Sequence, residues 1–90
     1  MGKKRERLEV IKDILNVVRQ NRKVKPTRLL YASNLSPQMF KDYVEELIRK
    51  KFVQVELIDG KNKLFSLTKK GQDFLMEYKA IENFVENFGL

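Results

Sequence analysis

TRLLYASNLSPQMFKDYVEELIRK, residues 27–50, carries the strongest structural signal in this chain. Residues 33–35, Ser-Asn-Leu, are typical of a turn. Ser36 and Pro37 then make a strong helix start, because Ser caps free backbone N–H groups and Pro suits the first helical position. Apolar side chains recur at helical spacing on both sides of the turn. The stretch therefore predicts two helices, over residues 27–32 and 37–50.

A further helix precedes this pair. Its apolar side chains recur at helical spacing and form a wide stripe: Leu8, Val10, Ile11, Ile14, Leu15, Val17 and Val18. The pattern predicts a helix over residues 8–20. Pro26 disfavours helical backbone at Lys25, so we expect a break there.

A β-hairpin is predicted after the third helix. Residues 53–57 alternate apolar with polar side chains, and Asp59-Gly60 is a hairpin turn signal. The return strand is expected over residues 63–67. A loop of three residues, 59–61, places Phe65 and Leu67 on the face of Val53 and Val55, whereas a shift of one residue would turn both side chains to solvent.

The last predicted helix begins after Thr68, its expected N-cap, and runs to about residue 87. Its apolar side chains are spaced 4, 3, 4, 3 in a heptad seam of Phe74, Tyr78, Ile81, Val85 and Phe88, with Leu75 and Phe84 beside it. Beyond Tyr78 the helix is expected to outrun its own domain. Leaving the last four large side chains in water would forgo several kcal/mol, on the order of 25 cal/mol per Å². We therefore expect a dimer interface of Phe74, Tyr78, Ile81, Phe84, Val85 and Phe88, with the two helices antiparallel.

Together these elements predict a mainly α fold with a two-stranded β wing. The order of helix, helix, turn, helix and hairpin describes a winged helix-turn-helix, here followed by a long C-terminal helix. We divide the chain into a flexible basic arm (residues 1–7), a winged helix-turn-helix domain (8–68) and a dimerisation helix (69–90).

Charge is distributed unevenly along the chain. The net charge is +7 over 90 residues. Residues 1–28 hold ten basic and three acidic side chains, whereas residues 71–90 hold one basic and four acidic side chains. A basic body attracts polyanions and accelerates their encounter, although the same charges could serve solubility alone.

The composition argues against an enzyme. The chain has no Cys and no His, so it lacks thiol nucleophiles, imidazole bases and the usual zinc ligands. Its carboxylates are scattered, and it has no Gly-rich phosphate loop. We expect no catalytic residues, metal, cofactor or small-molecule substrate. No signal peptide or stretch of roughly 18 apolar residues is present, so we expect a cytoplasmic, nucleoid location and no membrane partner.

Three stretches resemble a known family: RLEVIKDILNVV (7–18), TRLLYASNLSPQMFKDYVEELIRKKFV (27–53) and KLFSLTKKGQDFLMEYKAI (63–81). The chain resembles the small archaeal winged-helix DNA-binding proteins of the 10a type over about residues 5–85. The resemblance implies a homodimer joined by an antiparallel coiled coil of C-terminal helices. It also implies DNA contact that is largely independent of sequence, with roles in chromatin organisation and transcriptional regulation. The family usually has Gly before the apolar residue that opens the first strand, where this chain has Lys51.

Double-stranded DNA is therefore the expected partner. In a helix-turn-helix the second helix of the motif enters the major groove, and its first turns meet the bases. The predicted contacts lie at that helix start, in the cluster before the second helix and at the wing: Ser36, Gln38, Lys41, Arg19, Arg22, Lys23, Lys25, Arg28, Lys61 and Lys63. The arm of residues 1–7 adds four positive charges.

Two other functions remain open from sequence. A sequence-specific transcriptional regulator would read bases through Gln38, Met39, Lys41 and Asp42. A winged helix that binds only proteins would fit the near-neutral outer face of the third helix, where Asp42 and Glu45 offset Lys41 and Arg49. The basic cluster at residues 19–28 argues against this last function.

Overall fold

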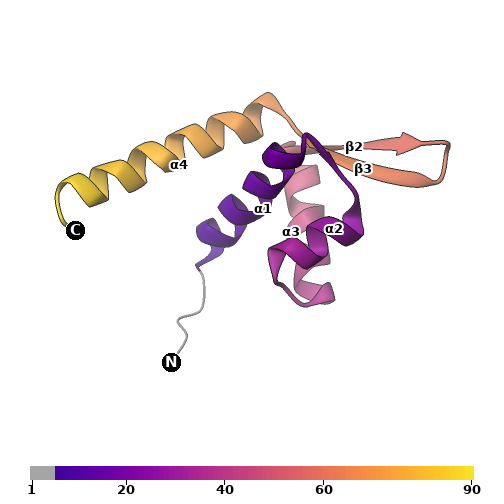
Figure 1. Ribbon diagram of the computed structural model, residues 1–90, viewed down its shortest axis with the longest axis horizontal. Coiled ribbons are helices and arrows are strands. Elements are labelled where there is room, and N and C mark those ends of the chain that lie inside the picture. The colour runs from indigo at the N-terminus through magenta and orange to yellow at the C-terminus, as the bar shows by residue number, and fades with distance from the viewer. Residues whose placement is uncertain (1–5) are drawn as a thin grey trace.

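A computed structural model describes residues 6–90. The elements follow in the order α1 (Arg7–Asn21), β1 (Lys23–Val24), α2 (Pro26–Ser33), α3 (Pro37–Arg49), β2 (Val53–Ile58), β3 (Asn62–Leu67) and α4 (Lys69–Asn87). Helices α1 to α3 gather at the base of the β2–β3 hairpin, and α4 runs away from the hairpin tip (Figure 1). Residues 1–5 of the predicted basic arm lie outside the described residues.

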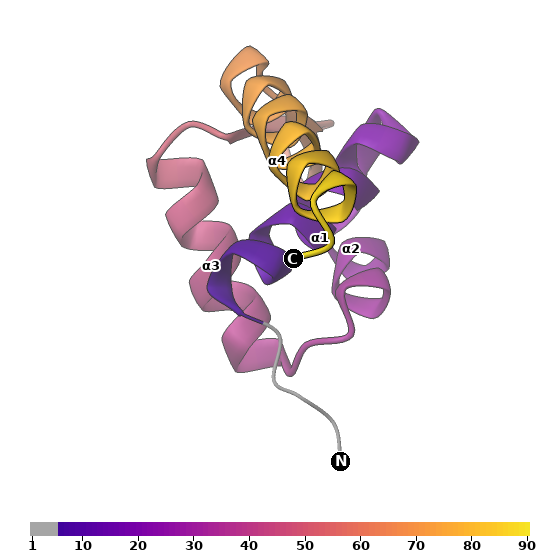
Figure 2. The ribbon, with the colours of Figure 1, turned by 90° about the vertical axis from the view of Figure 1, so that its left-hand side faces the viewer.

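Helix α1 forms the centre of the core. Its buried side chains match the predicted stripe: Val10, Ile11, Ile14, Leu15 and Val18. Seen from the end of α4, α1 lies between α2 and α3, and α4 crosses over it (Figure 2). Leu29 of α2, Leu47 of α3 and Phe65 of β3 complete the buried cluster around it.

The helix-turn-helix is built as the sequence predicts. Asn34 ends α2 in a left-handed conformation with φ of 58°, which a short polar side chain tolerates. Ser36 caps α3, because its Oγ accepts a hydrogen bond from Met39 N at 3.3 Å, and Pro37 occupies the first turn. The predicted start of α3 is thereby confirmed.

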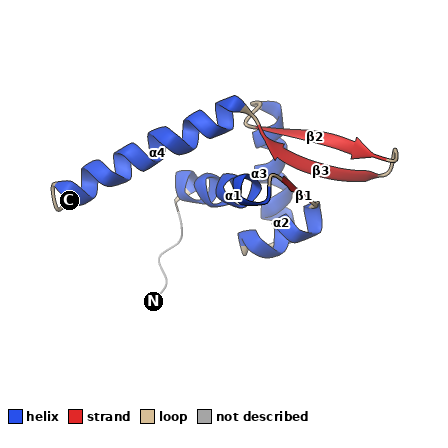
Figure 3. Cartoon of the chain, turned by 45° about the horizontal axis from the view of Figure 1, so that its top comes forward, coloured by secondary structure: helices blue, strands red, loops and turns tan. Residues whose placement is uncertain are grey.

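The sheet has one strand more than predicted. The wing itself is two-stranded, but β1 pairs antiparallel with β3, with Lys23 opposite Ser66 and Val24 opposite Phe65 (Figure 3). The prediction of only two strands was wrong because two residues are too few to show an alternating pattern. The pairing partner of β1 lies some forty residues further along the chain.

The hairpin register is confirmed. Val53 pairs with Leu67 and Val55 with Phe65, and the connecting loop is residues 59–61. Asp59 and Gly60 both have positive φ, 55° and 72°, as this tight loop requires. Val53 and Phe65 are buried at the wing base, while the distal half of the hairpin is exposed.

Thr68 and Gly71 fix the direction in which α4 leaves the sheet. Thr68 Oγ1 accepts from Gly71 N at 3.1 Å and donates to Lys51 O at 2.7 Å. A Cβ at Gly71 would lie 2.4 Å from Phe52 O, so only glycine allows the helix to approach this turn so closely. The predicted N-cap at Thr68 is confirmed.

Candidate nucleic-acid interface

The outer face of α3 is exposed, as its helical projection predicts. The exposed side chains include Gln38, Lys41, Asp42, Glu45 and Arg49. Gln38 Nε2 donates a hydrogen bond to Asp42 Oδ1 at 3.0 Å, so these two polar groups, one turn apart, engage each other. The face therefore carries two basic and two acidic side chains with a local amide–carboxylate bond. It offers little net charge of its own.

Exposed cations lie at three places in the helix-turn-helix and the wing. Lys41 lies in α3, and Lys25 and Arg28 lie at the start of α2. Lys61 and Lys63 lie at the hairpin tip. All five are exposed, and among residues 6–90 none of them has a carboxylate partner within ion-pair distance. Together with the Ser36 cap of α3 they form what we call the duplex face.

The basic cluster predicted over residues 19–28 is divided by the fold. Arg19 donates to Asn16 Oδ1 at 2.9 Å and lines a groove between α1 and α4 together with Lys79. Lys23 pairs with Glu56 of β2 at 3.1 Å. Arg22 ends α1 with φ of 60°. The structure thus places Lys25 and Arg28 beside the helix-turn-helix and Arg19 toward α4.

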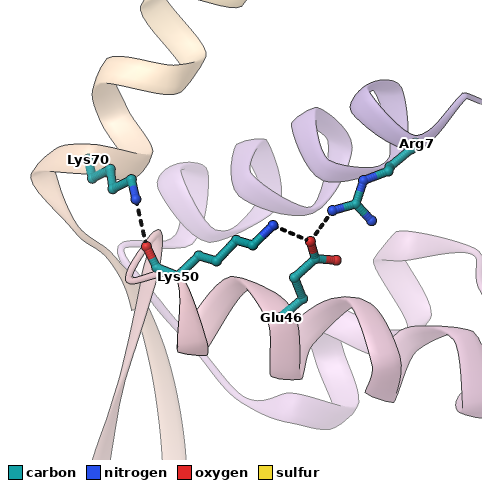
Figure 4. Close-up of polar contacts among 4 residues, drawn as sticks. All are labelled: Arg7, Glu46, Lys50 and Lys70. Carbon is teal, nitrogen blue, oxygen red and sulfur yellow. Dashed lines mark hydrogen bonds and ion pairs between the residues drawn. The ribbon is translucent and has the colours of Figure 1, made fainter.

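A carboxylate bridge, which sequence reasoning missed, ties α1 to α3. Glu46 accepts hydrogen bonds from Arg7 of α1 and, at 2.8 Å, from Lys50 Nζ one turn further along α3 (Figure 4). These two cations, Arg7 foremost, lower the pKa of Glu46 to about 2. Arg7 and Glu46 are 39 residues apart, so no local pattern could have paired them.

A second group of cations was also left out of the predicted site. Arg49 is the last residue of α3, Lys50 and Lys51 follow it, and Lys69 and Lys70 begin α4. Lys70 Nζ donates to Lys50 O at 2.9 Å (Figure 4). The same Nζ lies 4.6 Å from the centre of the Phe52 ring, and these two contacts join the two runs of cations. The sequence signal was present in the runs RKK and KK, but their proximity depends on the fold.

The predicted dimer seam divides into two parts along α4. Phe74 packs edge-on against Phe52, with ring centres 5.7 Å apart, and Tyr78 lies beneath Lys12 of α1. These two rings are half-buried in their own domain. The remaining side chains of the seam are exposed: Ile81 62%, Phe84 56%, Val85 38% and Phe88 67%. An apolar surface therefore remains on the distal half of α4.

A family comparison agrees with this geometry. The family model described as winged helix-turn-helix matches residues 4–86, nearly the whole chain.

This chain belongs to the winged helix-turn-helix family.

Comparison with curated proteins finds relatives of this chain in the archaeon Methanocaldococcus jannaschii. One uncharacterised protein of Methanocaldococcus jannaschii is 37% identical over 70 residues, which is 77% of this chain. The chain spans less than two thirds of the length of the curated relatives that it matches, 65% in this case.

Solved structures share the winged-helix fold. Sso10a-2, a DNA-binding protein from Sulfolobus solfataricus, superposes with a TM-score of 0.76 at 20% identity, covering 93% of this chain and 85% of that one. MepR, a transcription regulator of the Staphylococcus aureus multidrug efflux pump MepA, also gives 0.76, at 16% identity, covering 88% and 60% of the two chains. At these identities the likeness establishes the fold.

Within residues 6–90, no group of three or more acidic side chains is arranged to hold a metal ion. In the same part of the chain, every helix is too short or too polar to cross a membrane.

Proposed function

We propose that this winged helix binds double-stranded DNA largely without sequence preference, as a homodimer, and helps to organise the nucleoid. The observation that carries the proposal is the duplex face, whose unpaired cations lie on α2, α3 and the wing while the outer face of α3 is nearly neutral. Phosphate contacts position a protein on DNA, whereas base contacts specify sequence. This distribution of charge favours the first kind of contact.

In this proposal three parts of the protein contact the phosphate backbone of the DNA. The start of α3 enters the major groove, and its capped N-terminus faces phosphates with Ser36 and Lys41 nearby. Lys25 and Arg28 at the start of α2 contact one strand of the backbone. The wing tip, with Lys61 and Lys63, reaches phosphates further along the duplex. Arg19, Arg22 and Lys23 contribute a general positive field in this scheme.

Weak base readout follows from the engagement of Gln38. A glutamine that reads adenine must present both its amide nitrogen and its oxygen to the base. Here Nε2 of Gln38 is bonded to Asp42, and Asp42 adds a negative charge that repels phosphates. Insertion of α3 positioned by phosphates is therefore favoured over discrimination between bases.

The homodimer proposal depends on the distal half of α4. Ile81, Phe84, Val85 and Phe88 are exposed on a helix that projects beyond the body (Figure 1). Burying such side chains gives about 25 cal/mol per Å², so a second copy of the helix is a favourable partner. With about two and a half heptads the helix makes a short zipper, which favours an antiparallel pair that also packs on the partner domains.

The solved structures support DNA as the partner and leave its mode to experiment. Sso10a-2 is described as a DNA-binding protein, and its fold extends over most of this chain. The same architecture occurs in MepR, described as a transcription regulator.

A salt series on random-sequence duplex tests the proposal. Each neutralised phosphate releases counterions, so six contacts would give a slope of about −5 in the logarithm of affinity against that of salt. We expect affinity in the micromolar range or tighter, falling steeply with salt. A flat response, or no binding, would refute the mechanism and leave a protein-binding winged helix.

A sequence-specific regulator is the second candidate. It is favoured by the exposure of Met39 beside Gln38 on α3, since an apolar side chain can contact the methyl group of thymine. Footprinting across genomic fragments separates the two functions. One strongly preferred palindromic site indicates a regulator, and even protection indicates a nucleoid protein.

A further inference from the structure

The two runs of cations that the duplex face does not use meet at one corner of the fold. We define the corner patch as Lys50, Lys51, Lys69 and Lys70. Lys70 bonds the backbone of Lys50, and Thr68 bonds that of Lys51, so the two runs are held side by side. All four side chains are exposed. We propose that the corner patch is a second contact for double-stranded DNA on each chain, which rests on the proposed DNA-binding function.

The charge of the patch favours a polyanion. Glu46 pairs with Lys50 at 2.8 Å and Asp73 with Lys69 at 3.2 Å, so two carboxylates stand against four cations. Both sides of the Lys69 pair are well exposed, and such surface pairs hold their partners weakly. Among residues 6–90, Lys51 and Lys70 have no ion-pair partner. The patch therefore keeps a net positive charge.

The backbone at Lys51 adds a second argument. Its φ of 67° lies in the left-handed region, which is unfavourable for a residue with a side chain but not for glycine. The side chain is exposed and packs into no core. Binding of a polyanion by the Lys51 side chain would explain why a lysine occupies this strained backbone position.

The position of the patch separates it from the duplex face. Helix α3 has 13 residues and is about 20 Å long, and the six-residue strands are of about the same length. The start of α3 and the wing tip are thus the far ends of two arms that meet at the corner patch (Figure 1). Because α3 and the hairpin leave this corner in different directions, a straight duplex that lies across both far ends is held away from the corner (Figure 1). A second duplex is needed to occupy the patch.

The measurement is the number of short duplexes bound per chain, by sedimentation and native mass spectrometry at low salt. The probe is a random duplex of about one helical turn, on the order of 10 base pairs. We expect two duplexes per wild-type chain, the second bound more weakly. The corner variant combines Lys51→Asn, Lys69→Gln and Lys70→Gln; asparagine is chosen because it tolerates positive φ. It should bind one duplex per chain with the tighter affinity unchanged.

A matched variant of the duplex face, Arg28→Gln with Lys61→Gln and Lys63→Gln, removes the same charge elsewhere. It should weaken the tighter site by about tenfold or more and keep the weaker one. If instead it leaves both sites unchanged, the proposed function fails, while the corner variant still reports on the patch. Thermal melting checks that each variant folds. Should the corner variant be unfolded, Lys51→Asn with Lys69→Gln replaces it.

Two results would overturn the inference. One is a wild-type chain that saturates with a single duplex. The other is a folded corner variant that still binds two. If the wild-type chain takes one duplex but binds polyglutamate through the corner patch, the patch serves an acidic protein segment and the DNA inference is overturned.

Discussion

Gln38 and Asp42 face each other across one turn of α3, with the amide Nε2 donating to the carboxylate Oδ1 at 3.0 Å. The pair leaves a negative charge on the surface that is proposed to enter the major groove. We expect Asp42→Asn to raise affinity for random duplex by about two- to fivefold, because it removes repulsion of phosphates while an amide oxygen can still accept from Gln38. Fluorescence anisotropy at low salt measures the change.

Glu77→Gln, on the exposed surface of α4, is the control for net charge. It should change affinity less than Asp42→Asn does. Equal gains from both variants would mean that α3 has no special position on the DNA.

Glu46 links stability to pH. Its folded pKa is lowered to about 2 by Arg7 and Lys50, so its contribution is fully present above the unfolded pKa of about 4.3 and is lost as the pH falls toward 2. We expect Glu46→Gln to cost about 1 kcal/mol at neutral pH and to reduce the loss of stability over that acid range. Urea unfolding at a series of pH values gives both quantities.

The neighbouring Glu45→Gln serves as control, since Glu45 is exposed and has no ion pair among residues 6–90. Parallel pH profiles for Glu46→Gln and wild type would contradict the bridging role.

Lys51 occupies a backbone position that suits glycine. With φ of 67°, Lys51→Gly should stabilise the fold by about 0.5–1 kcal/mol, offset in part by the greater freedom of glycine in the unfolded chain. Chemical denaturation measures the gain. Lys50→Gly, at φ of −87°, should instead destabilise. A loss at both positions would rule out strain at Lys51.

The distal half of α4 decides the oligomeric state. Ile81→Asp with Val85→Asp places two charges on the exposed seam and should give monomers by light scattering, at a cost of several kcal/mol to the dimer. Ala80→Asp with Asn83→Asp adds the same charge on the side of α4 that lines the groove with α1, and should leave a dimer. Wild-type chains that remain monomeric at high concentration would exclude the interface.

Much of the fold follows from signals that act over a few residues. Ser36 and Thr68 cap the helices that they were predicted to cap, and Pro26 and Pro37 begin helices. The hairpin register could be predicted because strand side chains alternate, so the wrong loop length would expose Phe65. The heptad spacing in α4 likewise predicted an apolar surface, and its distal half is exposed.

The site was harder to predict because cations carry no periodic signal. Arg19 and Arg28 are close in sequence, but one faces α4 and the other begins α2. Lys51 and Lys69 are far apart in sequence, but the bonds of Thr68 and Lys70 bring their segments together.

Helix ends, turns and the alternation of apolar and polar side chains in the wing strands are set by neighbours within about four residues. These features could therefore be inferred from the sequence alone. The pairing of β1 with β3, the Arg7–Glu46 bridge and the corner patch join residues that are 18 to more than 40 positions apart. Such contacts depend on the directions in which α1, the hairpin and α4 leave the common core. Those directions come from the packing of whole elements, which no short stretch of sequence contains.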